Sequence, residues 1–105
     1  MKQNKVLSLI GLATKAGRIS SGEFSAEKAV KEGKAALVIV ATDASDNTHK
    51  KFRNMCTYYK VPFYIFSGKE ELGHAMGKEI RASLAICDKG FSDTIEKLLK
   101  QEITE

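Results

Sequence analysis

A continuous apolar run at residues 35–41, AALVIVA, limits the fold of this chain more than any other feature. A run of this length that is rich in β-branched residues predicts a strand with both faces buried. Such strands occur where helices cover the two sides of a sheet. The rest of the sequence is therefore expected to supply helices for two layers.

Segments with helical spacing alternate with short apolar runs along the whole chain. The predicted helices lie at about residues 6–13, 22–32, 46–59, 69–76 and 91–101. The predicted strands lie at about residues 18–20, 35–41, 61–66 and 83–87. This alternation with short links predicts an α/β fold, a three-layer α-β-α sandwich around a mixed sheet of about four strands. No interdomain linker is visible, so we expect one domain over residues 1–105.

Local residue types also predict the ends and inner faces of the helices. Ser21 is the predicted cap of the second helix, and Asp46 or Asn47 is the predicted cap of the third. Apolar residues of the third helix recur at helical spacing and are expected to face the core: Phe52, Met55, Cys56 and Tyr59.

The charge of the chain is distributed unevenly. The formal net charge is +4; residues 1–60 hold 11 Lys and Arg against 5 Asp and Glu, whereas residues 61–105 hold 6 against 8. A basic first half is compatible with a polyanionic partner, although many soluble proteins of this charge bind no nucleic acid.

The sequence lacks the residue patterns that catalysis requires. It has neither a GxxxxGK[ST] loop nor a GxGxxG segment after a strand. His49 and His74 are isolated histidines in predicted exposed helical positions, whereas a catalytic base needs a partner and an orienting group. Cys56 and Cys87 are far apart and form no CxxC, so we expect buried, reduced thiols. We therefore predict a noncatalytic protein without a metal or cofactor.

The composition favours a cytoplasmic protein. The apolar residues at 6–13 have helical spacing and no cleavage pattern after them, so we predict no signal peptide. No apolar run approaches the length of a membrane span, and no membrane partner is expected.

Three polar or basic segments could meet at one edge of such a sandwich. They are residues 22–28 (GEFSAEK), 42–51 (TDASDNTHKK) and 77–84 (GKEIRASL). A helix start with unpaired N–H groups suits a phosphate, and small residues beside Lys78 and Arg81 suit an unstacked base. Each segment also has an ordinary explanation: a capped surface helix, a solvated helix face, and a loop whose Leu84 begins a core strand.

The longer motifs point to a family. KAGRISSG (15–22), EKAVKEGKAALVIVATDAS (27–45), VPFYIFSGKEELGHAMGKEIR (61–81) and LAICDKGFSDTI (84–95) follow one another in the chain. Together they resemble the kink-turn RNA-binding ribosomal-protein family of the L7Ae/L30e type. The DAS-x-NT segment at 43–48, with KK after it, is most similar to the bacterial YlxQ-like subfamily.

The resemblance implies an α-β-α sandwich that binds kink-turn RNA, in which tandem G·A pairs beside a three-nucleotide bulge bend the helix sharply. By position, Gly22 matches the glycine where the family's backbone meets RNA, and Lys28 matches the lysine of its recognition helix. Asp43 stands near the expected bulge, and Arg81 to Leu84 match the loop that packs against the extruded nucleotide.

The chain departs from the family at two positions of the recognition helix. Phe24 and Ser25 stand where the family typically carries polar side chains that contact the G·A pairs. Phe24 cannot make those hydrogen bonds; it either stacks on a base, worth ~1–3 kcal/mol, or belongs to the core. Ser25 is shorter and reaches a base edge only at close approach.

These observations predict an RNA-binding protein of translation or RNA processing. Its expected partner is structured RNA, a kink-turn or ribosomal RNA, with the ribosome as a further candidate, and the chain is expected to be a monomer. The alternative is a protein-interaction module of the same fold that has lost kink-turn specificity. The predicted RNA contacts are Gly22, Phe24, Ser25, Lys28, Lys31, Asp43, Ala44, Lys50, Lys51, Arg81, Ala82, Ser83 and Leu84.

Overall fold

A four-stranded mixed sheet lies at the centre of the structure, a computed structural model that describes residues 2–103 and the side chains of residues 5–101. The strands are β1 (Ile19–Ser21), β2 (Leu37–Val40), β3 (Phe63–Ile65) and β4 (Ser83–Ile86), in the spatial order β1-β4-β2-β3. β2 is parallel to β3 and antiparallel to β4, and β1 is antiparallel to β4. The expected mixed sheet is confirmed.

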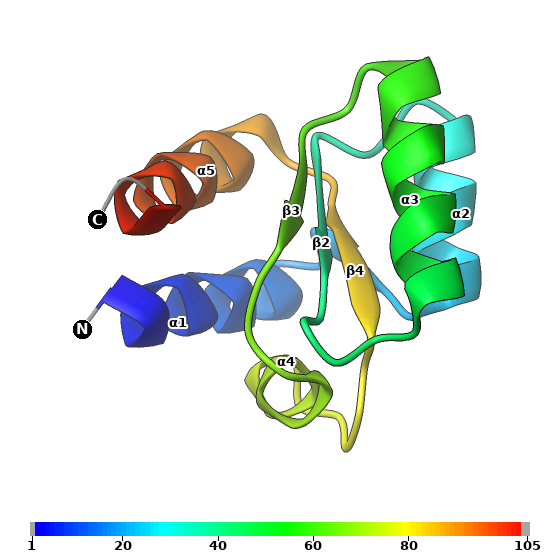
Figure 1. The fold of residues 1–105 in the computed structure, drawn as a ribbon. Coiled ribbons are helices and arrows are strands. Elements are labelled where there is room, and N and C mark those ends of the chain that lie inside the picture. The colour runs from blue at the N-terminus through cyan, green and yellow to red at the C-terminus, as the bar shows by residue number, and fades with distance from the viewer. Residues whose placement is uncertain (1, 104–105) are drawn as a thin grey trace.

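Helices cover both faces of this sheet (Figure 1). On one face lie α1 (Lys2–Lys15) and α5 (Lys89–Ile103), with α4 (Lys69–Ala75) packed beside α1 near one end of the sheet. On the other face lie α2 (Glu23–Lys31) and α3 (Asp46–Tyr59), side by side. The predicted three-layer α-β-α sandwich is confirmed.

The alternation of side chains along β2 divides the core into two halves. Leu37 and Ile39 pack with the α1, α4 and α5 side, whereas Val38 and Val40 pack with α2 and α3. All four residues of β2 are buried, as the apolar run predicted. Successive side chains of a strand point to opposite faces, so one continuous apolar segment supplies both layers.

Two predictions about helix starts are wrong. Ser21 belongs to β1, and the residue at the N-cap of α2 is Gly22, which has no side chain to accept a hydrogen bond. The N-cap of α3 is Ser45, whose hydroxyl accepts from the Thr48 N–H at 3.1 Å, and not Asp46 or Asn47. Several polar residues stand next to one another at each helix start. The point at which the preceding strand or turn ends decides which of them is the N-cap.

The inner face of α3 is one residue shorter than predicted. Phe52, Met55 and Cys56 are buried, but Tyr59 is 41% exposed. Lys60 follows in a left-handed conformation and ends the helix, so the chain turns away before Tyr59 is covered.

Among the described residues, no helix is both long and apolar enough to span a membrane. The prediction of one domain stays a prediction, and its residues 1 and 104–105 lie outside the described part.

Candidate nucleic-acid interface

Loops that are far apart in the sequence meet at one end of the sheet. The Gly22 N–H donates to the Ser83 carbonyl at 2.9 Å, and the Ala41 N–H donates to the Ala82 carbonyl at 2.8 Å. The start of α2, the end of β2 and the start of β4 therefore lie together. Figure 1 shows the α4 segment at this same end of the sheet. Two of the three segments singled out in the sequence are joined directly in this way.

Asp43 connects the loop after β2 to α4. Its Oδ1 accepts from the Lys69 N–H at 2.9 Å, and the Lys69 carbonyl accepts from the Arg81 N–H at 3.1 Å. Asp43 thus serves a free N–H group in the first turn of α4, which is a stabilising use of a carboxylate. Through Lys69, Asp43 also helps to fix the loop that carries Arg81.

The start of α2 is open and has an aromatic ring beside it. Gly22 has a φ of +92°, a conformation that favours glycine, and a Cβ added there would lie 4.0 Å from Cδ of Arg81. Phe24 is 79% exposed, so of its two possible roles the core position is wrong. Ser25 is exposed beside it. A backbone turn, a guanidinium and an uncovered ring therefore share one surface.

The four predicted lysines differ in their surroundings. Lys28 and Lys50 are exposed and form no ion pair within the described part of the chain. Lys31 pairs with Glu27 at 2.8 Å. Lys51 lies between two carboxylates, 3.0 Å from Glu23 and 2.7 Å from Glu27.

These ion pairs change the electrostatics of α2. The neighbouring ammonium groups of Lys31 and Lys51, through hydrogen bonds and charge, lower the pKa of Glu27 from 4.5 to about 2. Hydrogen bonds from Lys51 to Glu27 and Glu23 raise the pKa of Lys51. Lys51 therefore neutralises acidic groups of α2 and is less available to a phosphate than Lys28 and Lys50.

The loop before β4 is only partly available. Arg81 and Ala82 are half-buried, whereas Ser83 and Leu84 have no exposed surface. The prediction that Ser83 and Leu84 contact a nucleotide is corrected, because β4 places them between the two helical layers. Ala44, after β2, is half-buried and packs against the core.

Ile80 also belongs to this surface, although the sequence pointed only to its segment, residues 77–84, and not to Ile80 as a contact. It is 55% exposed, and its carbonyl accepts from Nη1 of Arg81 at 2.7 Å. An apolar residue in a loop gives no periodic signal, because periodicity predicts exposure only inside helices and strands.

The remaining polar groups have structural surroundings. His49 is half-buried, not exposed as predicted, and its Nε2 lies 2.7 Å from the Ala41 carbonyl. A carbonyl only accepts, so Nε2 carries the proton and the ring joins α3 to the residue that follows β2. Burial raises the pKa of the Cys56 thiol to about 11, which keeps it unreactive. Cys87 is a free thiol. It is half-buried, whereas the sequence predicted that it would be buried.

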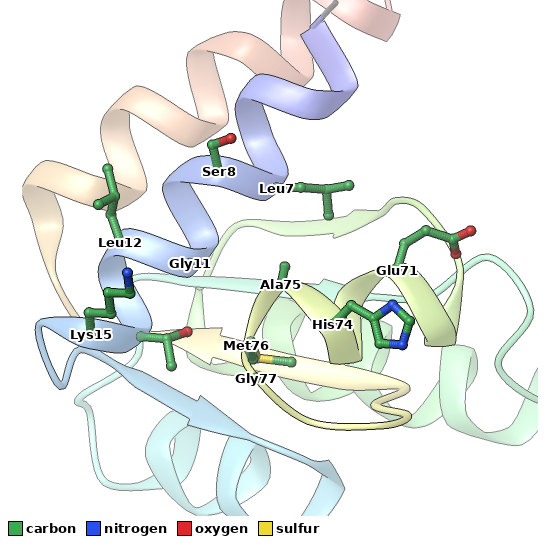
Figure 2. A pocket seen from close by; sticks show the side chains of 11 residues that line it. Leu7, Ser8, Gly11, Leu12, Lys15, Glu71, His74, Ala75, Met76 and Gly77 are labelled. Atoms are coloured by element: carbon green, nitrogen blue, oxygen red, sulfur yellow. The ribbon is translucent and has the colours of Figure 1, made fainter.

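An open groove of about 810 Å³ lies between α1 and α4 (Figure 2). Leu7 and Leu12 of α1 and His74 and Ala75 of α4 line it. Among the described residues, no three His, Cys, Asp or Glu side chains are grouped to hold a metal ion.

Fold and surface together define a small α-β-α sandwich that carries a cationic, partly apolar surface at one end of its sheet. Residues 4–96 match the model of the Ribosomal protein L7Ae/L30e/S12e/Gadd45 family. The chain belongs to this family, as its motifs indicated.

Two curated relatives match nearly the whole chain. It is 41% identical over 91 residues to the RNA-binding protein YlxQ of Bacillus subtilis (strain 168), covering 87% of this chain and 91% of that protein. It is 36% identical over 98 residues to the RNA-binding protein YlxQ of Enterococcus faecium, covering 93% and 94%. Both relatives are named for RNA binding and neither as an enzyme, in agreement with the predicted noncatalytic protein.

Solved structures share the fold. A protein of unknown function from Bacillus halodurans matches with a TM-score of 0.89 and 38% identity, covering 91% of this chain and 97% of that chain. The Giardia lamblia 15.5kD RNA binding protein matches with a TM-score of 0.80 and 24% identity, covering 95% and 86%. At that lower identity the likeness concerns the fold alone.

Proposed function

We propose that this chain is a noncatalytic RNA-binding protein that recognises structured RNA of the kink-turn kind, in cytoplasmic translation or RNA processing. The observation that carries the proposal is the open start of α2, where Gly22 lies against Arg81 and Phe24 is uncovered. Membership of the family and the names of the two YlxQ relatives support it.

The start of α2 supplies the contacts to the RNA backbone. The N-cap Gly22 has no side chain over the first turn, so a phosphate or a guanine edge can approach the N–H groups there. The positive end of the helix dipole and the guanidinium of Arg81 favour the phosphate. Lys28, between one and two turns further along α2, extends the same positive surface.

Apolar groups supply the contacts to unpaired nucleotides. Phe24 stacks on a base and replaces the polar contacts to G·A pairs that other family members make, a contribution of ~1–3 kcal/mol. Ile80 and Ala82 pack against a nucleotide that leaves the stack. Ser25, Asp43 and Ala44 border this surface, and Lys31 and Lys50 add positive charge around it.

The first experiment compares three RNAs by gel shift near physiological salt: a kink-turn, the same RNA with its G·A pairs converted to Watson–Crick pairs, and a plain duplex. We expect the kink-turn to bind tightest as a complex with one protein molecule. Lys28→Ala/Arg81→Ala should weaken it at least tenfold with an unchanged melting temperature. If about four to six phosphates are neutralised, log Kd should change with log salt with a slope on the order of 4.

The matched control is Lys5→Ala/Lys97→Ala, which removes the same charge from exposed positions of α1 and α5. It should bind the kink-turn like the unchanged protein. Equal binding of all three RNAs would replace kink-turn recognition by general attraction to phosphates. Binding to none would favour the protein-interaction module, and the proposal would fail.

A further inference from the structure

A segment without acidic residues covers all but the first residue of α3 and continues beyond its end. Residues 47–69 contain no Asp or Glu but five basic residues: Lys50, Lys51, Arg53, Lys60 and Lys69. Apart from Lys51, which faces α2, none of these five forms an ion pair within the described part of the chain. The positive charge of this segment is therefore left for a partner.

One side of α3 gathers these groups. Lys50, Asn54 and Tyr58 follow one another at intervals of four residues, and Arg53 and Thr57 lie beside them. All five are exposed, whereas Phe52, Met55 and Cys56 on the opposite side are buried. We call this surface of Lys50, Arg53, Asn54, Thr57 and Tyr58 the α3 face.

Aromatic rings stand at the far end of the α3 face. Tyr58 is 78% exposed and Tyr59 is 41% exposed, and their rings meet edge to face with centroids 4.9 Å apart. The Arg53 guanidinium lies over the Phe63 ring at 5.6 Å from its centroid. Tyr59 and Phe63 thereby hold Tyr58 and Arg53, two flat groups on which a base can stack.

Exposed rings among unpaired cations suit a single nucleic-acid strand. The bases of a duplex are stacked on one another, so a free tyrosine ring can stack only on an unpaired base. One carboxylate, Asp46, precedes Lys50 by one turn on this side of α3, but Lys50 and Arg53 leave the side net positive, which favours a phosphate backbone. The 14-residue α3 is about 21 Å long at ~1.5 Å per residue. It begins at the sheet end that carries the candidate interface (Figure 1).

We propose that the α3 face binds an unpaired RNA strand that continues from the structured RNA at the start of α2. Lys50 and Arg53 contact its phosphates, and Tyr58 stacks on one of its bases. This inference extends the proposed RNA-binding function and rests on it, but a single strand tests the α3 face separately.

The test uses three fluorescent RNAs: a blunt kink-turn, the same kink-turn with an unpaired extension, and an unstructured strand of about 12 nucleotides, within the usual range of single-strand site sizes. Binding is followed by fluorescence anisotropy at several salt concentrations. For the unchanged protein, the extension should tighten binding about tenfold. Tyr58→Ala should remove this gain and weaken binding of the single strand about tenfold, whereas Tyr58→Phe should keep both.

The charge variant Lys50→Ala/Arg53→Ala should lower the salt slope for the single strand by about 1.4, since each phosphate contact on a single strand contributes about 0.7. Lys5→Ala/Lys97→Ala removes the same charge from the other helical layer and should leave this slope unchanged. Circular dichroism checks that every variant stays folded.

The outcomes separate the two proposals. If the blunt kink-turn binds but the extension adds nothing, or if Tyr58→Ala binds the single strand as tightly as the unchanged protein, the α3 inference is overturned while the proposed function stands. If the kink-turn is not bound but the single strand binds and depends on Tyr58, the α3 face is a strand-binding surface and the proposed function fails.

Discussion

Glu27 shows how one residue changes the role of its neighbours. Its carboxylate pairs with Lys31 one turn along α2 and with Lys51 across the gap to α3. Glu23 adds a second carboxylate to Lys51. The lysines that appear in the sequence as free positive charge are thus partly neutralised, and the net positive surface shifts toward Lys28 and the α3 face.

The pH dependence of stability should report this ion pair. Because the pKa of Glu27 is lowered from 4.5 to about 2 in the folded chain, its stabilising contribution is present above about pH 4.5 and is lost as the pH falls toward 2. Glu27→Gln should lower the free energy of unfolding by about 0.5–1 kcal/mol at pH 7, the size of a surface ion pair. Near pH 2 the two proteins should be nearly equally stable.

Urea unfolding of both proteins between pH 2 and pH 7 measures this difference. Glu32→Gln is a suitable control, since Glu32, just after the end of α2, forms its one ion pair among the described residues with Lys34. A difference that stays constant across this pH range would show that the Glu27 carboxylate does not stabilise the fold through its charge.

Among the elements, α4 determines where the Arg81 loop lies. Gly73 of α4 packs directly on the backbone of the loop: a Cβ added there would come within 2.5 Å of the Glu79 carbonyl oxygen and 2.9 Å of the Ile80 Cα. In the first turn of α4, the Lys69 N–H donates to the Asp43 side chain and the Lys69 carbonyl accepts from the Arg81 N–H. The position of α4 therefore sets the distance between Arg81 and the start of α2.

Gly73→Ala should move this loop, because the neighbouring atoms are backbone and cannot simply rotate away. We expect a loss of about 1–3 kcal/mol in the free energy of unfolding, as for other overpacked sites. Kink-turn affinity should fall as well, since Arg81 is displaced from Gly22. Denaturant unfolding and gel shift on the same sample measure both effects.

Gly33→Ala provides the comparison. Gly33 has a φ of +75° and no atom within 4 Å of an added Cβ, so its substitution costs stability through backbone strain alone. It should not weaken RNA binding. Unchanged RNA affinity in Gly73→Ala would mean that the loop position does not matter for recognition.

At the scale of the whole molecule, two half-cores hold the sheet between the helical layers. Ile39 is fully buried on the side of α1, α4 and α5, and its neighbours Val38 and Val40 are fully buried on the other side. β2 lies between β4 and β3, so it joins both half-cores and both sheet neighbours. Its end also carries the loop with Asp43.

Ile39→Ala should therefore lower the free energy of unfolding by about 2–5 kcal/mol, the range for a large buried residue. In a chain of this size each 1 kcal/mol lowers the melting temperature by about 4–8 °C. Ile65→Ala on edge strand β3, where the side chain is 39% exposed, should cost less than half as much. Similar losses in the two variants would contradict the central position of β2.

Several features followed from local sequence because they depend on neighbouring residues. The apolar run at 35–41 predicted a doubly buried strand, and helical spacing together with the short apolar runs predicted the order of the nine elements that the described residues form. Helix starts were less predictable: Ser45 rather than Asp46 caps α3, a choice that depends on where the preceding turn ends. The buried Ser83 and Leu84 were assigned both to a strand and to the interface, and their place in β4 excludes the second role.

The sequence by itself determined the family, the three-layer class and the segments that carry positive charge, because motifs and periodicity are properties of adjacent residues. Only the tertiary structure decided that Phe24 is uncovered, that Lys51 is neutralised by Glu23 from 28 positions away, and that Gly22 meets Arg81. These facts depend on which distant segments the sheet brings together. The α3 face depends on both the sequence and the tertiary structure. The sequence determines its residue types, and the fold determines that they are exposed.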